Sequence, residues 1–285
     1  MPLVGLLELL SAAKRSRHGV GAFNVIQLEH AEAIVAGAAA SAAPVVLQVS
    51  ENTITYHGSA APILSACLRL AEESPAPVTV HLDHATSFEL VRQAVAVGVG
   101  SVMFDASTRA HEENVAATAE VVRWCHERGV RVEAELGEVG GKDGVHAPGA
   151  RTDPDDAAEY VASTGVDALA VAVGSSHAML TRDAVLDDDL IARIASAVTV
   201  PLVLHGSSGV PDSGLRSAVA AGIVKINIAT HLNARFTAAV RERLTADSRL
   251  VDPRKYLGPA RDAVSHEVGR LLGVLGAAGT ASTVG

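Results

Sequence analysis

The sequence predicts an α/β fold, a closed (β/α)₈ TIM barrel, from three observations. Short apolar runs alternate with longer helical patterns along the whole chain, an order typical of parallel strands joined by crossover helices. There are eight such runs, the strand number of this barrel. The alternative, an open doubly wound sheet, usually has a glycine-rich turn after its first strand, and residues 20–27 contain no such turn. No internal boundary is visible, so residues 1–285 are predicted to form a single domain.

The predicted elements follow in chain order. An amphipathic helix at residues 3–16 comes first; its basic residues follow the apolar part, unlike those of a secretory signal. Strands are predicted at 20–25, 44–49, 77–82, 101–105, 130–136, 167–173, 200–205 and 223–228. Helices are predicted between them at 27–42, 58–73, 87–97, 111–128, 154–164, 187–197 and 211–221. Two extra helices are predicted at 230–245 and 258–275, near the C-terminus. The irregular stretch 137–154 is interpreted as a flap over a site, because loops of this length in compact domains are usually functional.

Composition narrows the possible partners and location. The 285 residues include 23 basic and 32 acidic side chains, a formal net charge of -9, and no basic block that would favour nucleic acid. No stretch is interpreted as a membrane span, which needs a single helix of roughly 18 or more predominantly apolar residues. The two cysteines, Cys67 and Cys125, are too few for a disulfide scaffold. We therefore expect a cytoplasmic protein that binds neither nucleic acid nor membrane.

Acidic and histidine side chains occur where several predicted strands end. Asp83 and His84 follow the third strand, Glu135 lies late in the fifth, His177 follows the sixth, and His205 ends the seventh. Catalytic groups of such barrels come from these carboxyl ends. Three neutral imidazoles suit a divalent ion such as zinc, and an adjacent carboxylate can transfer a proton. The chain has 12 histidines, so any single one is more often structural than a ligand.

Five motifs in register resemble those of a known family, the class II, metal-dependent ketose-bisphosphate aldolases. They lie at residues 81–84, 101–107, 132–137, 204–209 and 225–230. The family includes fructose- and tagatose-bisphosphate aldolases. The resemblance extends from Ala22 to Arg261, nearly the whole chain, and it implies the same barrel fold.

The resemblance also implies roles for individual residues. The family's zinc ligands fall on His84, His177 and His205, and its catalytic acid/base falls on Asp83. Its glutamate beside the ligands, which can approach a resting zinc, falls on Glu135.

The substrate side of the site is implied in the same way. The phosphate of dihydroxyacetone phosphate would be held by Gly174, Gly206, Ser208 and Thr230. Asn227 would contact the dihydroxyacetone part and Ser50 the aldehyde part, and Asn24 is expected in the substrate site as well. For the glycines the alternative role is that of a turn residue, and for the serines and the threonine it is that of a helix cap.

The sequence departs from the family pattern at three places. The flap run Gly140–Gly144 is one residue shorter than usual and lacks the glutamate implicated in proton exchange; Asp143 is the candidate substitute. Ala178 replaces a glycine whose carbonyl often helps to bind a monovalent cation, K⁺ or Na⁺. His231 follows Thr230 where an acidic residue is common.

The implied function is that of a zinc-dependent lyase of carbohydrate metabolism, in glycolysis. It would reversibly cleave a ketose 1,6-bisphosphate, with fructose favoured, to dihydroxyacetone phosphate and glyceraldehyde 3-phosphate through a metal-stabilised enediolate. A homodimer or homotetramer is implied too. Tagatose 1,6-bisphosphate or another ketose phosphate remains an alternative substrate, and a non-catalytic barrel subunit an alternative role. A metal-dependent hydrolase barrel commonly needs His-x-His at the end of strand 1, which is missing here.

Overall fold

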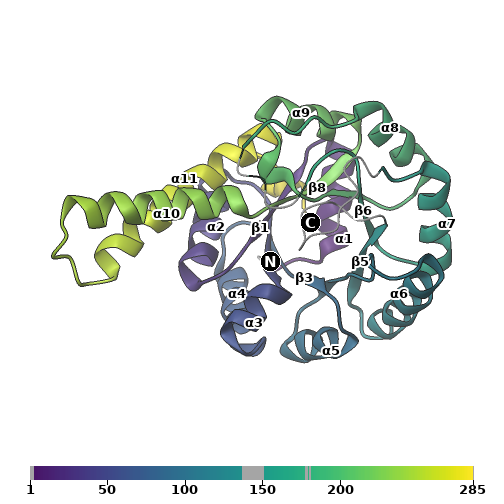
Figure 1. The fold of residues 1–285 in the computed structure, drawn as a ribbon, viewed down its shortest axis with the longest axis horizontal. Coiled ribbons are helices and arrows are strands. Elements are labelled where there is room, and N and C mark those ends of the chain that lie inside the picture. Colours follow the sequence, from purple (N-terminus) through teal and green to yellow (C-terminus); the bar gives the residue numbers. More distant parts are fainter. Residues whose placement is uncertain (1–2, 137–150, 177–178, 180, 285) are drawn as a thin grey trace.

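A computed structural model shows eight parallel strands closed into one barrel in the order β1 to β8 (Figure 1). It describes residues 3–136, 151–176, 179 and 181–284. The strands are β1 (Val20–Asn24), β2 (Val45–Ser50), β3 (Val78–Ala85), β4 (Ser101–Phe104), β5 (Arg131–Leu136), β6 (Ala168–Val171), β7 (Leu202–Leu204) and β8 (Ile223–Ile228). Strand β1 pairs with both β2 and β8, which closes the ring. The predicted fold class is confirmed.

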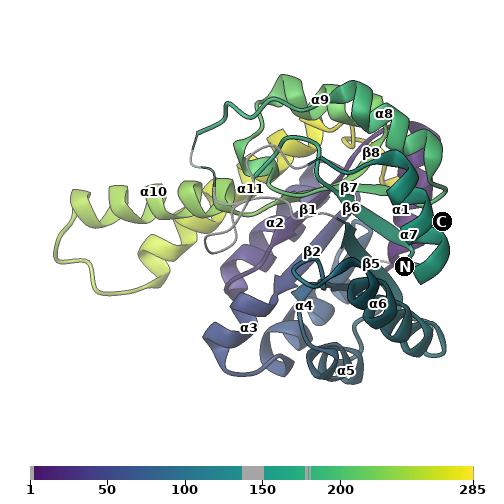
Figure 2. The same cartoon turned by 45° about the vertical axis from the view of Figure 1, so that its right-hand side comes forward.

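Helices surround the barrel. They are α1 (Leu6–Ser16), α2 (Leu28–Ala40), α3 (Glu51–His57), α4 (Ala61–Glu73), α5 (Phe88–Val97), α6 (His111–His126), α7 (Pro154–Thr164), α8 (Asp188–Ala197), α9 (Asp212–Ala221), α10 (Thr230–Ala246) and α11 (Arg254–Val274), with short 3₁₀ turns η1 (Ser207–Gly209) and η2 (Ala281–Thr283). In two views, the ends of α10 and α11 that are joined by residues 247–253 project away from the barrel (Figures 1 and 2).

Local sequence signals account for where several helices begin. Ser87, Asp153 and Asp187 each accept a hydrogen bond from a backbone N–H of the following first turn, in α5, α7 and α8. Such caps satisfy N–H groups that have no partner within the helix. Pro154 occupies the first position of α7, where its missing N–H costs nothing.

Helix α1 closes the amino-terminal end of the barrel. Leu6, Leu9 and Leu10 are fully buried and form one cluster with interior residues of the strands, among them Val46 and Val203. The apolar face of the first predicted helix therefore packs against the barrel interior and excludes water from this end.

Two element predictions were wrong in detail. Residues 51–57 form helix α3 directly after β2, where no helix was predicted, because Ser50 accepts a hydrogen bond from Thr53 N and caps a first turn. Helix α11 begins at Arg254, four residues before the predicted start, because Pro259 is accommodated inside it. None of the helices within the described residues is long and apolar enough to span a membrane.

Candidate active site

The third strand places an acid and an imidazole side by side at the carboxyl end of the barrel. Neighbouring side chains of a regular strand point to opposite faces, so in a regular strand Asp83 and His84 would not point to the same face. The pairing of β3 with β4 shifts register between Leu82 and Ala85, and His84 has a left-handed φ of 51°. The local bulge turns both side chains toward the site, with His84 Nε2 3.9 Å from Asp83 Oδ1.

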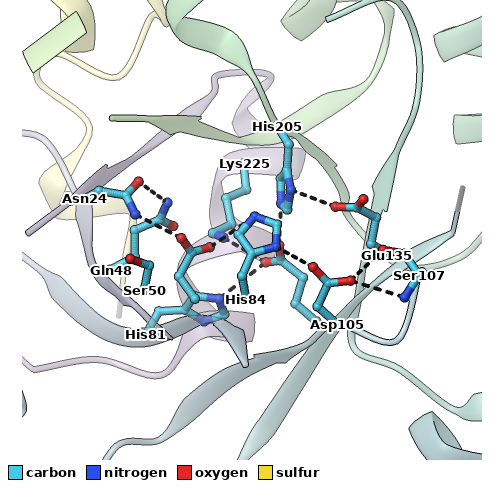
Figure 3. A network of polar contacts seen from close by, with 12 residues as sticks. Asn24, Gln48, Ser50, His81, His84, Asp105, Ser107, Glu135, His205 and Lys225 are labelled. Carbon is cyan, nitrogen blue, oxygen red and sulfur yellow. Dashed lines mark hydrogen bonds and ion pairs between the residues drawn. The ribbon is translucent and has the colours of Figure 1, made fainter. Parts of the chain in front are cut away.

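Asp83 is held by an amide chain from the two preceding strands, and the two amides, Asn24 and Gln48, are labelled in Figure 3. Asn24 Nδ2 donates to Asp83 Oδ2 at 2.9 Å, and Gln48 Nε2 donates to Asn24 Oδ1 at 2.8 Å. The other carboxylate oxygen, Asp83 Oδ1, is buried without a hydrogen bond among the described residues. One oxygen is therefore fixed by Asn24, and the other is available to a bound ligand.

His84 is oriented by a second carboxylate. Its Nδ1 lies 2.8 Å from Asp105 Oδ2, and Asp105 Oδ1 accepts from both the backbone N–H and the hydroxyl of Ser107. A carboxylate on one ring nitrogen fixes the tautomer and leaves the other nitrogen as a metal ligand. His84 Nε2 is that nitrogen.

Together, His84, Glu135 and His205 can hold a metal ion. Their ligand atoms all lie within 4.8 Å of one another. The imidazoles of His84 and His205 meet edge to face at 4.7 Å between ring centroids, and His205 Nδ1 lies 3.0 Å from Glu135 Oε2. Two imidazoles and a carboxylate are donors that zinc accepts, so these residues fit a zinc ion.

The charges at the site are set by its buried neighbours. Burial opposes the ionised form of Asp83, but His84, Lys225 and His205 outweigh it and lower the pKa of Asp83 to about 2. Burial also opposes the charged form of His205, yet the carboxylates of Glu133 and Glu135 raise the pKa of His205 to about 9. Asp83 is thus ionised at neutral pH, as a general base must be.

Glycines line the turns where phosphate binding is predicted. Gly174 and Gly206 have φ values of 123° and 66°, which side chains rarely tolerate. A Cβ on Gly206 would lie 2.5 Å from Ser176 O, and one on Gly174 would lie 2.4 Å from Val185 O. Neither position accepts a side chain, because other backbone atoms lie too close. At turns packed this closely, backbone N–H groups can bind an anion.

The predicted hydroxyl contacts already have structural roles. Ser208 Oγ accepts from the backbone N–H groups of Ala229 and His231, at 3.3 and 3.2 Å, so it caps the start of α10, where Thr230 is the first residue. Ser50 caps α3. The capping alternative is therefore observed for both serines, although a capping oxygen still has its own O–H to donate to a ligand.

Asn227 is buried at the same end of the barrel. It pairs in register with Ala22 of β1, and its Oδ1 has no hydrogen bond among the described residues. Three predicted site residues, His177, Asp143 and Ala178, lie outside the residues that the structure describes. Their roles remain predictions, as does the flap.

Four polar residues of the site were assigned no role in it from the sequence: Gln48, Asp105, Glu133 and Lys225. The signal for two of them was the two-residue period of a strand. Glu133 stands two residues before Glu135, and Lys225 two before Asn227. A second polar residue at this spacing in a buried strand indicates another inward-pointing group.

Comparison with known proteins shows which family the chain is similar to. The chain matches the class-II fructose-bisphosphate aldolase family over residues 4–280. It is 41% identical to a fructose-bisphosphate aldolase of Geobacillus stearothermophilus over 286 residues, 99% of this chain and all of the relative. It is 42% identical to a fructose-bisphosphate aldolase of Staphylococcus aureus over 94% of this chain and 95% of that one.

A solved structure has the same fold. The crystal structure of the YdjI aldolase from Escherichia coli K12 superposes with a TM-score of 0.88, at 32% identity, over 98% of this chain and 99% of that one. These matches span nearly the full length of both partners. The chain belongs to the class-II fructose-bisphosphate aldolase family.

Proposed function

We propose that this protein is a zinc-dependent aldolase that reversibly cleaves fructose 1,6-bisphosphate to dihydroxyacetone phosphate and glyceraldehyde 3-phosphate. The observation that carries the proposal is the position of the Asp83 carboxylate beside the metal-donor group of His84, Glu135 and His205. Family membership and the printed names of the relatives support the same activity.

The metal would be held by His84 and His205, with Glu135 beside them and His177 as the third imidazole expected from the sequence. A bound zinc supplies a Lewis acid that neutralises the negative charge developing on the substrate's carbonyl oxygen. Asp105 and Glu133 hold the two described imidazoles in orientation.

Asp83 would transfer the proton. In cleavage its carboxylate accepts the proton of the hydroxyl on the aldehyde side, and in condensation it returns that proton. The amide of Asn24 fixes Asp83 Oδ2, so Oδ1 is the oxygen assigned to the transfer. Because Asn24 is itself held by Gln48, the carboxylate keeps its orientation between turnovers.

The substrate's phosphate would bind at the turns after β6, β7 and β8. Gly174 and Gly206 would present backbone N–H groups, and Ser208 and Thr230 hydroxyls, to its oxygens. These turns provide an anion site without a cluster of cationic side chains, in keeping with an acidic chain of net charge -9. Asn227 would contact the dihydroxyacetone part and Ser50 the aldehyde part.

Further properties are proposed from the resemblance alone. The chain would act as one cytoplasmic domain, assembled into a homodimer or homotetramer. A monovalent cation, K⁺ or Na⁺, would assist phosphate binding. Asp143 would stand in for the missing flap glutamate in proton exchange.

The test is steady-state cleavage of fructose 1,6-bisphosphate and tagatose 1,6-bisphosphate by zinc-loaded protein, with a chelator-treated control. We expect a preference for fructose 1,6-bisphosphate, abolished by the chelator and restored by zinc. A preference for tagatose 1,6-bisphosphate would keep the reaction class and change the substrate. Zinc-loaded protein that cleaves neither sugar would contradict the proposal.

A further inference from the structure

A fully buried lysine lies beneath the metal-donor group. Lys225 of β8 is 0% exposed, and its Nζ lies 2.8 Å from Oε2 of Glu133, which is also 0% exposed. Removing two charges from water is costly, and apolar residues of similar volume often serve stability as well or better. Stability alone therefore does not account for an ion pair at this depth of the barrel.

The second oxygen of Glu133 connects the ion pair to a metal-ligand candidate. Glu133 Oε1 lies 3.0 Å from His205 Nε2. The opposite ring nitrogen, His205 Nδ1, lies 3.0 Å from Glu135 Oε2, within the group that could hold the metal. Lys225, Glu133 and His205 thus form a chain that leads from the barrel interior to the site; Lys225 and His205, its two ends, are labelled in Figure 3.

Neighbouring groups do not replace Lys225. Apart from His205, which contacts Oε1, the other basic group beside Glu133 is His81, but its Nε2 lies 3.7 Å from Glu133 Oε2, beyond hydrogen-bond length. Its Nδ1 is taken up by Ser101 Oγ at 2.7 Å. Among the described residues, the Lys225 ammonium is therefore the close cationic partner of Glu133 Oε2.

We propose that Lys225 and Glu133 are positioning residues of the metal site. The ammonium keeps the Glu133 carboxylate in place, and Glu133 holds the His205 ring so that Nδ1, not Nε2, is presented to a divalent ion. The inference rests on the proposed function for the identity of the site. It adds Glu133 and, deeper in the barrel, Lys225 to the residues that keep the His205 ring in place.

The test measures metal binding directly. Metal-free wild-type protein and the variants Glu133→Gln, Lys225→Met and the double variant are titrated with Co²⁺, whose visible absorption reports both the Kd and the coordination geometry. Loss of such an outer carboxylate typically weakens metal binding 10- to 100-fold. We expect a rise in Kd of about that size in each single variant, with an altered cobalt spectrum.

Urea unfolding of the same proteins separates positioning from a structural role. A single substitution leaves one buried charge without its partner, whereas the double variant leaves none. We expect the double variant to regain stability over the single variants while its Co²⁺ Kd stays raised. An unchanged Kd in folded variants, or a Kd that recovers together with stability in the double variant, would overturn the proposal.

Asp167→Asn is the matched control. Asp167 is buried before β6 and accepts from Val132 N, His126 Nε2 and Arg131, so the change is again carboxylate to amide in a polar network, here one that reaches the surface. It lies at the amino end of the strands, whereas the metal-donor group lies at the carboxyl end, and we expect lower stability with an unchanged Co²⁺ Kd.

The titration also separates this proposal from the proposed function. Wild-type protein that binds Co²⁺ tightly but cleaves no ketose bisphosphate would contradict the aldolase activity. The changes in Co²⁺ Kd of the variants would still test the positioning role. Wild-type protein that binds no Co²⁺ would contradict both.

Discussion

The two ends of the barrel are built from the same strands but filled with opposite kinds of side chain. In β7 and the residue after it, Val203 packs in the cluster with α1 and His205 joins the metal-donor group two residues later. In β2, Val46 belongs to the same apolar cluster, whereas Gln48 holds Asn24. In both strands a step of two residues, the period at which side chains return to the same face, separates an apolar residue of the barrel core from a polar residue of the site.

The difference shows how this fold can hold a concentration of buried charge. Burying charged groups is costly unless they are paired, and Asp83, Asp105, Glu133 and Glu135 are all buried at or below the carboxyl end. The amino end, closed by α1, supplies apolar burial that offsets such a cost. Substitutions at the carboxyl end should therefore mainly change catalysis, and substitutions at the amino end should mainly change stability.

The largest effect should come from the carboxyl end, at Asp83. We expect Asp83→Ala to lower kcat about 10²- to 10⁴-fold, because the proton transfer loses its base. Metal content, measured by atomic absorption, should stay at the wild-type level, because His84 and His205 remain. Near-normal turnover in fully metal-loaded Asp83→Ala protein would exclude Asp83 as the base.

A substitution at the amino end should lower stability and leave activity unchanged. Leu9→Ala removes a fully buried side chain of α1, and we expect it to lower the free energy of unfolding by about 2–5 kcal/mol. Cleavage activity per folded molecule should not change. Leu3→Ala is the control, since Leu3 is 38% exposed. If Leu9→Ala instead lowers kcat in folded protein, the two ends are not independent.

A smaller effect is expected at the rim of the carboxyl end, at Ser208. Ser208→Ala removes a hydroxyl predicted to bind phosphate, and we expect KM for the sugar bisphosphate to rise about 10-fold with little change in kcat. Because the same oxygen caps α10, stability should fall by about 1 kcal/mol.

Ser87→Ala, which removes a cap from α5, is the matched control. It should cost similar stability without raising KM. An equal KM in both variants would assign Ser208 to capping alone.

The smallest effect concerns acid stability at the base of the projecting helices. Glu267 of α11 is partly shielded from water, which opposes ionisation, but hydrogen bonds from His231 and Arg270 lower its pKa to about 2. A lowered folded-state pKa contributes stability above the ordinary value of 4.5, which is lost as pH falls toward about 2.

Glu267→Gln should therefore flatten the decline of the urea-unfolding midpoint between these pH values. The exposed Glu242 provides a comparison, because Glu242→Gln should leave the decline unchanged. Parallel declines in wild-type protein and Glu267→Gln would refute the assignment.

The sequence predicted the barrel because strand and helix periods are local properties. Eight apolar runs alternating with helical patterns were enough to specify closed parallel topology. The same approach missed α3, since the residues after Ser50 carry no strong helical pattern and are ordered by a side-chain cap. It identified Asp83, His84, Glu135 and His205 as residues at strand ends.

The polar layer below the site was harder to predict. Lys225 and Glu133 form their contact across 92 positions in the sequence, and no local pattern pairs them. Nor does the two-residue period of a strand explain how the consecutive residues Asp83 and His84 reach one site, because it assigns them to opposite faces. The bulge in β3 resolves that conflict, and it depends on pairing with β4.

The bulge in β3 has a mechanical consequence. Asp83 and His84 are attached to the two sides of a single peptide unit, whose atoms move as one plane. Slow movements of loops or helices can carry this pair toward or away from a substrate, but they carry both side chains together. The spacing between the proton-transfer group and the metal ligand is thus limited by covalent geometry, whereas every other spacing in the site depends on non-covalent packing.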